Sequence, residues 1–86
     1  MDNIEMNQMA VKMLEDWDPL NYGPEAYDTE TADIVAAMQG ITDATELAQV
    51  MQEVYEFSYA QHVPIESCIE MSEKLLALKL AVQCNL

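Results

Sequence analysis

The chain has 86 residues, enough for one domain, and carries 16 acidic residues against three lysines and no arginine, for a net charge of -13. This charge repels phosphates, so we expect neither nucleic acid nor an anionic membrane as a partner; a protein with a basic surface, or a cation, is favoured. No apolar run approaches the ~18 residues of a membrane-spanning helix, and the N-terminus has no basic segment typical of a secretory signal. We therefore expect a cytoplasmic protein.

A first helix is predicted at residues 3–17. Its apolar side chains recur at steps of three and four residues, the period of one helix face: Met6, Met9, Ala10, Met13 and Trp17. Asp2 and Glu5 have the spacing of a capping box at its start. Pro19 ends it, because the residue before a proline avoids the helical region.

The segment 18–28 is predicted to be a loop and is rich in aromatic side chains. Two interpretations of its rings stay open: they cap the helical core, or they belong to a binding surface. At its start, Trp17, Asp18 and Pro19 indicate a structural corner. Trp17 supplies a large buried surface, Asp18 can accept backbone donors of the following turn, and Pro19 stiffens that turn.

A short second helix is predicted at residues 29–39. Asp28 or Thr29 is a suitable N-cap for it. Its apolar stripe consists of Ile34, Val35 and Met38. Gly40 follows where a left-handed cap is wanted, so we expect the helix to end there.

A third helix is predicted at residues 43–61, with Asp43 and Glu46 at capping-box spacing. The expected core face of this helix consists of Leu47, Val50, Met51, Val54 and Phe57. Tyr55 and Tyr59 are four residues apart and share a different flank, which could contact another element or a partner.

The fourth helix, predicted at residues 64–83, has the clearest period and is expected to be central. Pro64 suits its first turn, where the missing N–H is not needed. Cys68 and Cys84 are too far apart along this helix to form a disulfide, so we expect two free thiols, which fit a reducing compartment. The predicted fold class is all-α: a compact single domain, residues 1–86, of three long helices and one short helix.

The residues of this chain give little support for a catalytic function. His62 and Cys68 are the one conceivable thiol–imidazole pair, and Cys68 occupies a core position. Two isolated glycines cannot build a phosphate-binding loop. We therefore expect no enzyme, no cofactor and no metal held by cysteine or histidine.

Carboxylates crowd the first loop and the helix ends beside it, but their spacing does not fit a calcium-binding hand. A non-standard cation site, a solvated face and an acidic docking patch stay open. The candidate partner surface comprises this segment and the tyrosine flank of the third helix: Asp18, Tyr22, Glu25, Tyr27, Asp28, Glu30, Asp33, Tyr55 and Tyr59.

The order Trp17-Asp18-Pro19, Tyr22-Gly23, then Tyr27-Asp28 with Glu30 resembles a family of small uncharacterised bacterial proteins, the YugE-like domains of unknown function. The stretch 54–58 and the leucine-rich last helix are also similar. The resemblance implies a cytoplasmic, single-domain helical protein and supplies no activity or cofactor. Similar small proteins are sometimes suspected of being toxin-neutralising immunity proteins.

Three hypotheses for function follow. We favour a non-enzymatic acidic protein-binding module, of which an inhibitor or immunity protein is one form, with a basic protein as its partner. One alternative is a structural subunit that self-associates, for example as a homodimer. The other is a binder of a small ligand or cation through the acidic loop.

Overall fold

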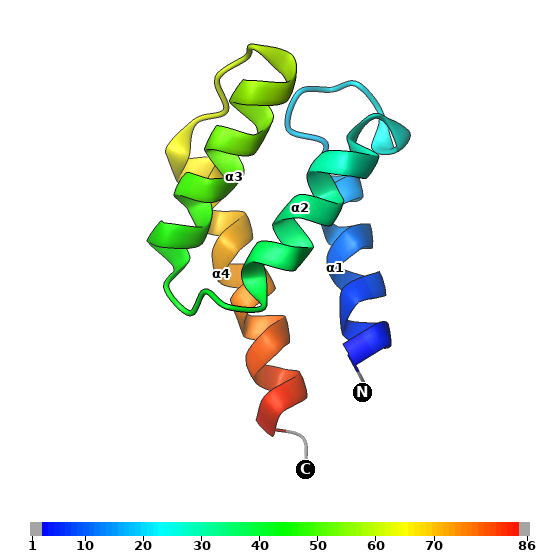
Figure 1. Cartoon of the computed structure of the whole chain (residues 1–86), viewed down its shortest axis with the longest axis vertical. Coiled ribbons are helices and arrows are strands. Elements are labelled where there is room, and N and C mark those ends of the chain that lie inside the picture. Colours follow the sequence, from blue (N-terminus) through cyan, green and yellow to red (C-terminus); the bar gives the residue numbers. More distant parts are fainter. Residues whose placement is uncertain (1–2, 85–86) are drawn as a thin grey trace.

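Periodic apolar residues form four α-helices in the computed structural model, which describes residues 3–84 (Figure 1). They are α1 (Asn3–Trp17), α2 (Asp28–Met38), α3 (Ala44–Tyr59) and α4 (Ile65–Cys84). A 3-10 helix, η1 (Pro24–Tyr27), occupies the end of the segment predicted as a loop. Within residues 3–84 there is no strand, and the all-α four-helix fold class is confirmed.

The four helices close into a ring of contacts. α3 and α1 each pack against both α4 and α2. Both described ends of the chain lie at the lower end of Figure 1, whereas the loop after α1 and the turn between α3 and α4 meet at the upper end. Along residues 3–84, no helix is both long and apolar enough to span a bilayer.

The core is filled by apolar side chains from all four helices. Its largest fully buried aliphatic and sulfur-containing members are Leu14, Ile34, Met38, Leu47, Met51, Leu75, Val63 and Cys68. Burial raises the pKa of the Cys68 thiol to about 11, so this thiol is a core side chain and not a nucleophile at neutral pH. The side chain of Cys84 lies outside the described residues.

The predicted core face of α3 is wrong at its C-terminal end. Phe57 is 93% exposed, while Tyr55 is fully buried. Successive residues of an α-helix are about 100° apart, so two residues separate these side chains by about 200° around the axis. Because Tyr55 faces the core, Phe57 must face solvent. The buried residues of this helix are Leu47, Ala48, Met51 and Tyr55.

The helix ends follow the predicted caps in part. The Asp43 carboxylate accepts the Glu46 N–H at 2.9 Å, so the predicted N-cap of α3 is confirmed. Asp2, predicted to cap α1, lies outside the described residues. The N-cap of α2 is Tyr27, with no side-chain hydrogen bond, so Asp28 and Thr29 are wrong as caps.

Gly40 does not form the predicted left-handed cap, because its φ is not positive. The C-terminus of α2 is instead capped by a residue from α4. The buried ammonium group of Lys79 donates to the carbonyls of Met38 (2.8 Å), Gln39 (3.0 Å) and Ile41 (3.2 Å). A cation at the C-terminus of a helix also complements the helix dipole. No local sequence pattern predicted this contact.

Candidate functional site

The corner after α1 is organised by the Asp18 carboxylate. Asp18 has a positive φ of 43°, which turns the chain out of the helix. Its carboxylate accepts the N–H groups of Tyr22 (3.0 Å) and Gly23 (3.1 Å) and the hydroxyl of Tyr27. The Tyr27 bond, followed by those backbone N–H groups, outweighs desolvation and holds the pKa of Asp18 below its usual value. The prediction that Asp18 accepts backbone donors in this turn is confirmed.

Tyr27 lies beneath this corner and is fully buried. Its hydroxyl donates to Asp18 and accepts the backbone N–H groups of Leu20 (3.1 Å) and Tyr22 (3.4 Å). Burial, and then the bond to Asp18, raises the pKa of Tyr27. A fully buried side chain cannot touch a partner without unfolding, so Tyr27 is wrong as a member of the partner surface.

The single tryptophan and all four tyrosines form one cluster of rings at this end of the bundle. Trp17 and Tyr27 each meet Tyr55 edge-on, with ring centroids 5.9 and 5.6 Å apart. Tyr59 contacts Tyr27 and Tyr22 at 5.7 and 5.4 Å. The Tyr22–Tyr59 pair is tilted, whereas the other three pairs meet edge-to-face, a contact that favours aromatic pairs beyond the area they bury. The loop rings therefore cap the core, as one of the two open interpretations held.

Tyr55 is also wrong as a partner-surface residue, because it is fully buried at the centre of these rings. Among the described residues its hydroxyl has no hydrogen-bond partner. Burial raises its pKa, so the group stays neutral.

Tyr59 connects the ring cluster to η1 and α2. Its hydroxyl donates to the Glu30 carboxylate at 2.6 Å and also contacts the Ala26 carbonyl. Desolvation disfavours the charged form of Glu30, but the hydrogen bonds from Tyr59 and Ser58 outweigh it and lower the pKa. Glu30 and Tyr59 are therefore occupied in holding η1, α2 and α3 together.

The other predicted surface residues are solvent-exposed: Tyr22, Glu25, Asp28 and Asp33. The Tyr22 hydroxyl accepts a hydrogen bond from the Gln61 amide, which ties the corner to the turn after α3. Within residues 3–84, no three acidic, histidine or cysteine side chains lie close enough together to hold a metal ion. Exposed Asp28 and Asp33 lie on α2 and Glu25 lies on η1 beside it, so these three acids remain accessible to solvent.

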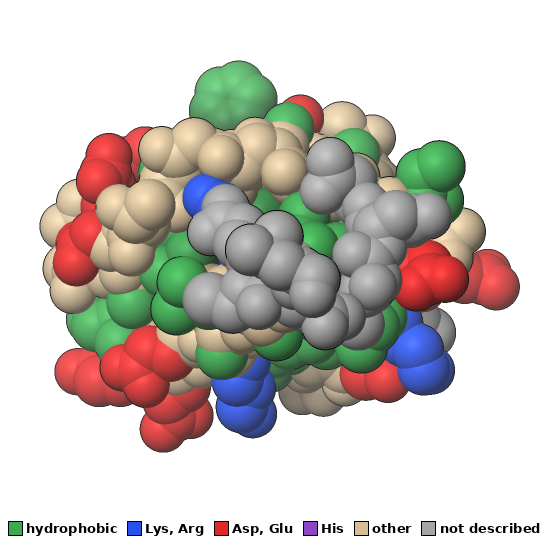
Figure 2. All heavy atoms as spheres, turned by 90° about the horizontal axis from the view of Figure 1, so that it is seen from below, with side chains coloured by type: hydrophobic (Ala, Val, Ile, Leu, Met, Phe, Trp, Pro, Cys, Tyr) green, Lys and Arg blue, Asp and Glu red, His purple; other side chains and the backbone are tan. Residues whose placement is uncertain are grey.

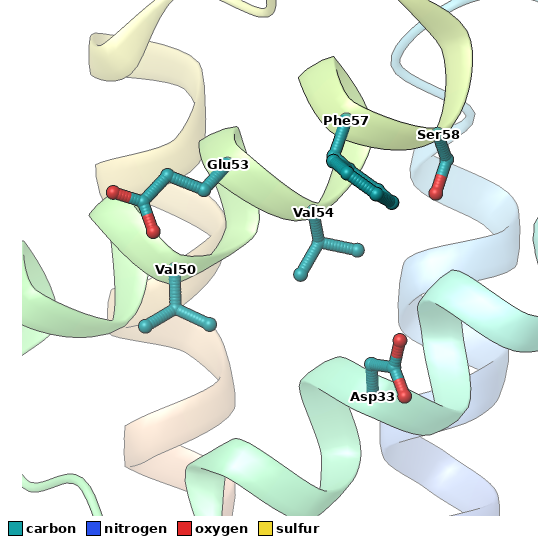
Figure 3. Close-up of a pocket in the computed structure, with 6 residues that line it drawn as sticks. All are labelled: Asp33, Val50, Glu53, Val54, Phe57 and Ser58. Atoms are coloured by element: carbon teal, nitrogen blue, oxygen red, sulfur yellow. The ribbon is translucent and has the colours of Figure 1, made fainter.

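An apolar groove of about 320 Å³ lies between α2 and α3 (Figure 3). Its lining is Asp33, Val50, Glu53, Val54, Phe57 and Ser58. Val50, Val54 and Phe57 point from α3 toward the space above α2, and Asp33 points up from α2 on the opposite wall (Figure 3). Asp33 is the one member of the predicted partner surface that borders this groove.

The sequence does contain a signal for this groove, in the number of apolar positions on α3. Val50, Val54 and Phe57 lie at steps of four and three residues, the spacing of one helix face. The inward stripe of α3 already has its own four buried residues. Val50 and Val54 are half-buried and Val54 packs in part against the core, so this stripe flanks the buried face and its outer side, with exposed Phe57, lines the groove.

Charge around the groove has a single sign. The segment 28–59, which contains α2 and α3, carries seven acidic residues and no lysine or arginine: Asp28, Glu30, Asp33, Asp43, Glu46, Glu53 and Glu56. The three lysines lie on α1 and α4. At the lower end of the molecule, by contrast, lysine side chains are visible among the acidic side chains that project on several sides (Figure 2).

A second hollow of about 310 Å³ lies between α1 and α4. It is lined by Met13, Asp16, Trp17, Met71 and Lys74. Its charges have both signs, and Asp16 already pairs with Lys12 at 3.4 Å. The single sign of charge at the α2–α3 groove makes that groove the stronger candidate for recognition.

The fold and groove define a small acidic helical domain with an apolar groove between α2 and α3. The chain belongs to the family described as Domain of unknown function (DUF1871), whose model matches residues 9–85. It is 39% identical over 75 residues to the uncharacterized protein YugE of Bacillus subtilis (strain 168), covering 87% of each chain. The resemblance to YugE-like proteins is thereby confirmed.

A solved structure has the same fold. It is a crystal structure of a protein from Bacillus stearothermophilus that is 33% identical in sequence and superimposes with a TM-score of 0.88. The match covers 91% of this chain and 96% of the other.

Gly23→Ala should destabilise the corner by about 1–3 kcal/mol, because φ 94° with ψ 156° is a region that only glycine enters readily. Gly40→Ala is the matched control: its φ is not positive and a Cβ there meets nothing within 4 Å. We expect Gly40→Ala to be neutral or slightly stabilising. Urea unfolding of both variants is the measurement, and equal losses would show that the corner geometry is not strained in this way.

Acidification should remove the contribution of Asp18 and Glu30 to stability. Both carboxyls have a lower pKa in the folded protein than in the unfolded chain. Their stabilisation is therefore complete above the unfolded pKa values, about 3.9 and 4.3, and is lost as pH falls through the folded values. Urea unfolding between neutral pH and about pH 3 should show a shallower acid loss for Asp18→Asn than for wild type. Glu70→Gln, which removes an exposed carboxylate, is the control; the same slope in all three proteins would contradict the prediction.

Proposed function

We propose that this domain is a non-enzymatic protein-binding module that takes a partner with a basic surface at the α2–α3 groove. The observation that carries the proposal is Phe57. A phenylalanine that is 93% exposed gains about 1.5–3 kcal/mol when it is buried, and here it borders a preformed groove. Exposed apolar surface with a polar rim is typical of protein interaction sites.

The charge of the chain supports the choice of partner. A net charge of -13 accelerates encounter with a cationic protein and makes binding weaken as salt rises. It also opposes pairing between two copies of this chain, since the acidic faces would meet. The proposal therefore differs from the sequence-based one in its site: the groove replaces the corner, whose tyrosines are engaged within the fold.

The absence of catalysis is part of the proposal. His62 is exposed and lies beside Gln52 and Glu56, while Cys68 is buried with a raised thiol pKa. A buried thiol of this kind supports a reducing compartment, and we place the function in the cytoplasm. An inhibitor or immunity protein is a specific form of such a module, because blocking a partner requires affinity and no chemistry.

Affinity capture from an extract of the native cells tests this proposal. The immobilised wild-type domain should retain a basic protein at low salt and release it at moderate salt. Phe57→Ser should fail to retain it, whereas Leu80→Ser, which also removes an exposed apolar side chain, should retain it. Capture of nothing by the wild type, or of the same protein by all three, would refute the proposed site and function.

A further inference from the structure

The apolar residues of α3 that line the groove have the spacing that a docked helix requires. Val50, Val54 and Phe57 occupy positions i, i+4 and i+7, and they extend about 10 Å along the helix axis. Helices that bind in grooves place apolar residues at the same spacing against such a stripe. No part of residues 3–84 covers Phe57.

Carboxylates stand on both sides of this stripe. Glu53 projects from α3 on one side, and Asp33 faces α3 from α2 on the other (Figure 3). Both carboxylates are exposed, and neither α2 nor α3 contains a lysine or arginine. A second copy docked through the same face would place acidic rims against acidic rims, a repulsive arrangement. Charge complementarity therefore selects a cationic occupant.

We propose that the α2–α3 groove binds an amphipathic helix with basic residues along both edges of its apolar face. The apolar face packs on Val50, Val54 and Phe57, and the two basic edges pair with Asp33 and Glu53. This inference rests on the proposed function and specifies the partner's structure at the groove. Pairing at both edges fixes the rotation of the docked helix, since an apolar stripe alone would permit several.

Three labelled synthetic peptides test the inference by fluorescence anisotropy. The first contains leucine at helical i, i+3, i+4 and i+7 positions and lysine elsewhere. The second has the same composition with the leucine pattern scrambled, and the third replaces every lysine by glutamate. The amphipathic lysine peptide should bind wild type about tenfold or more tightly than the scrambled peptide, because only it can present a continuous apolar stripe. The glutamate peptide should not bind.

Variants then locate the binding. Phe57→Ser should weaken the amphipathic lysine peptide about tenfold or more, the loss expected when a phenylalanine contact is removed. The double variant Asp33→Asn, Glu53→Gln should weaken it and reduce its salt dependence. Leu80→Ser and the double variant Glu66→Gln, Glu70→Gln are matched controls on α4 and should bind as wild type does. Circular dichroism checks that each variant is folded.

Each other result overturns the inference in a recognisable way. Equal binding of the lysine peptides shows attraction by charge alone, which leaves the protein-binding function standing without a helical occupant. Failure of every peptide, with a Phe57-dependent protein still captured from extract, shows that the partner docks through another structure. A wild type that sediments as a dimer and a Phe57→Ser variant that sediments as a monomer identify a second copy as the occupant. Failure of both peptide binding and extract capture refutes the proposed function as well.

Discussion

Replacing Tyr27 by phenylalanine should lower the free energy of unfolding by about 1–3 kcal/mol. The substitution keeps the buried ring and removes only its hydroxyl. That hydroxyl donates to Asp18 and accepts the backbone N–H groups of Leu20 and Tyr22. Without it, those groups lose their partner at a half-buried corner, and an unpaired polar group there is costly. Chemical denaturation with urea measures the loss.

Tyr55→Phe is the matched control for this experiment. Tyr55 is buried as completely as Tyr27 and contacts its ring at 5.6 Å, but its hydroxyl has no partner among the described residues. Removing a buried hydroxyl without a partner should be neutral or stabilising. Equal losses in the two variants would mean that the hydroxyl bonds at the corner contribute nothing specific.

Replacing Lys79 by methionine should cost about 2–3 kcal/mol of stability, because three carbonyls lose a charged donor. Methionine fills a similar volume with an apolar side chain, so the loss reports the hydrogen bonds and not a cavity. The measurement is again urea unfolding.

Lys74→Met separates the role of Lys79 from the general value of a positive charge in this acidic chain. Both lysines lie on α4, but Lys74 is exposed. Its substitution should change stability by no more than about 0.5 kcal/mol. A similar loss in both variants would show that net charge, and not the capping of α2, explains the effect.

The sequence predicted the helices well because local features determine them. The stripe of α1 and the cap at Asp43 are readable within a few residues, and α1 ends at Trp17 as expected before Asp18-Pro19. The corner could be predicted for the same reason. The backbone donors that Asp18 accepts lie only a few residues further along the chain.

Contacts between helices that are distant in sequence could not be predicted from local features. Apolar side chains occupy so much of the circumference of α3 that periodicity alone could not decide whether Tyr55 or Phe57 faces the core. The helices packed against α3 determine it, and among the described residues they leave the predicted core residue Phe57 as the most exposed large apolar side chain. Gly40 failed as a cap for a similar reason, since Lys79 lies far along the sequence.

Titration of the ¹⁵N-labelled domain with the amphipathic lysine peptide tests the central claim most directly. If the groove is the binding site, amide shifts should concentrate at Val50, Glu53, Val54, Phe57 and Ser58, and at Asp33 across from them. They should be absent in the Phe57→Ser variant. Shifts that concentrate instead at the α1–α4 hollow around Met13 and Met71, or that spread evenly over the acidic surface, would contradict it.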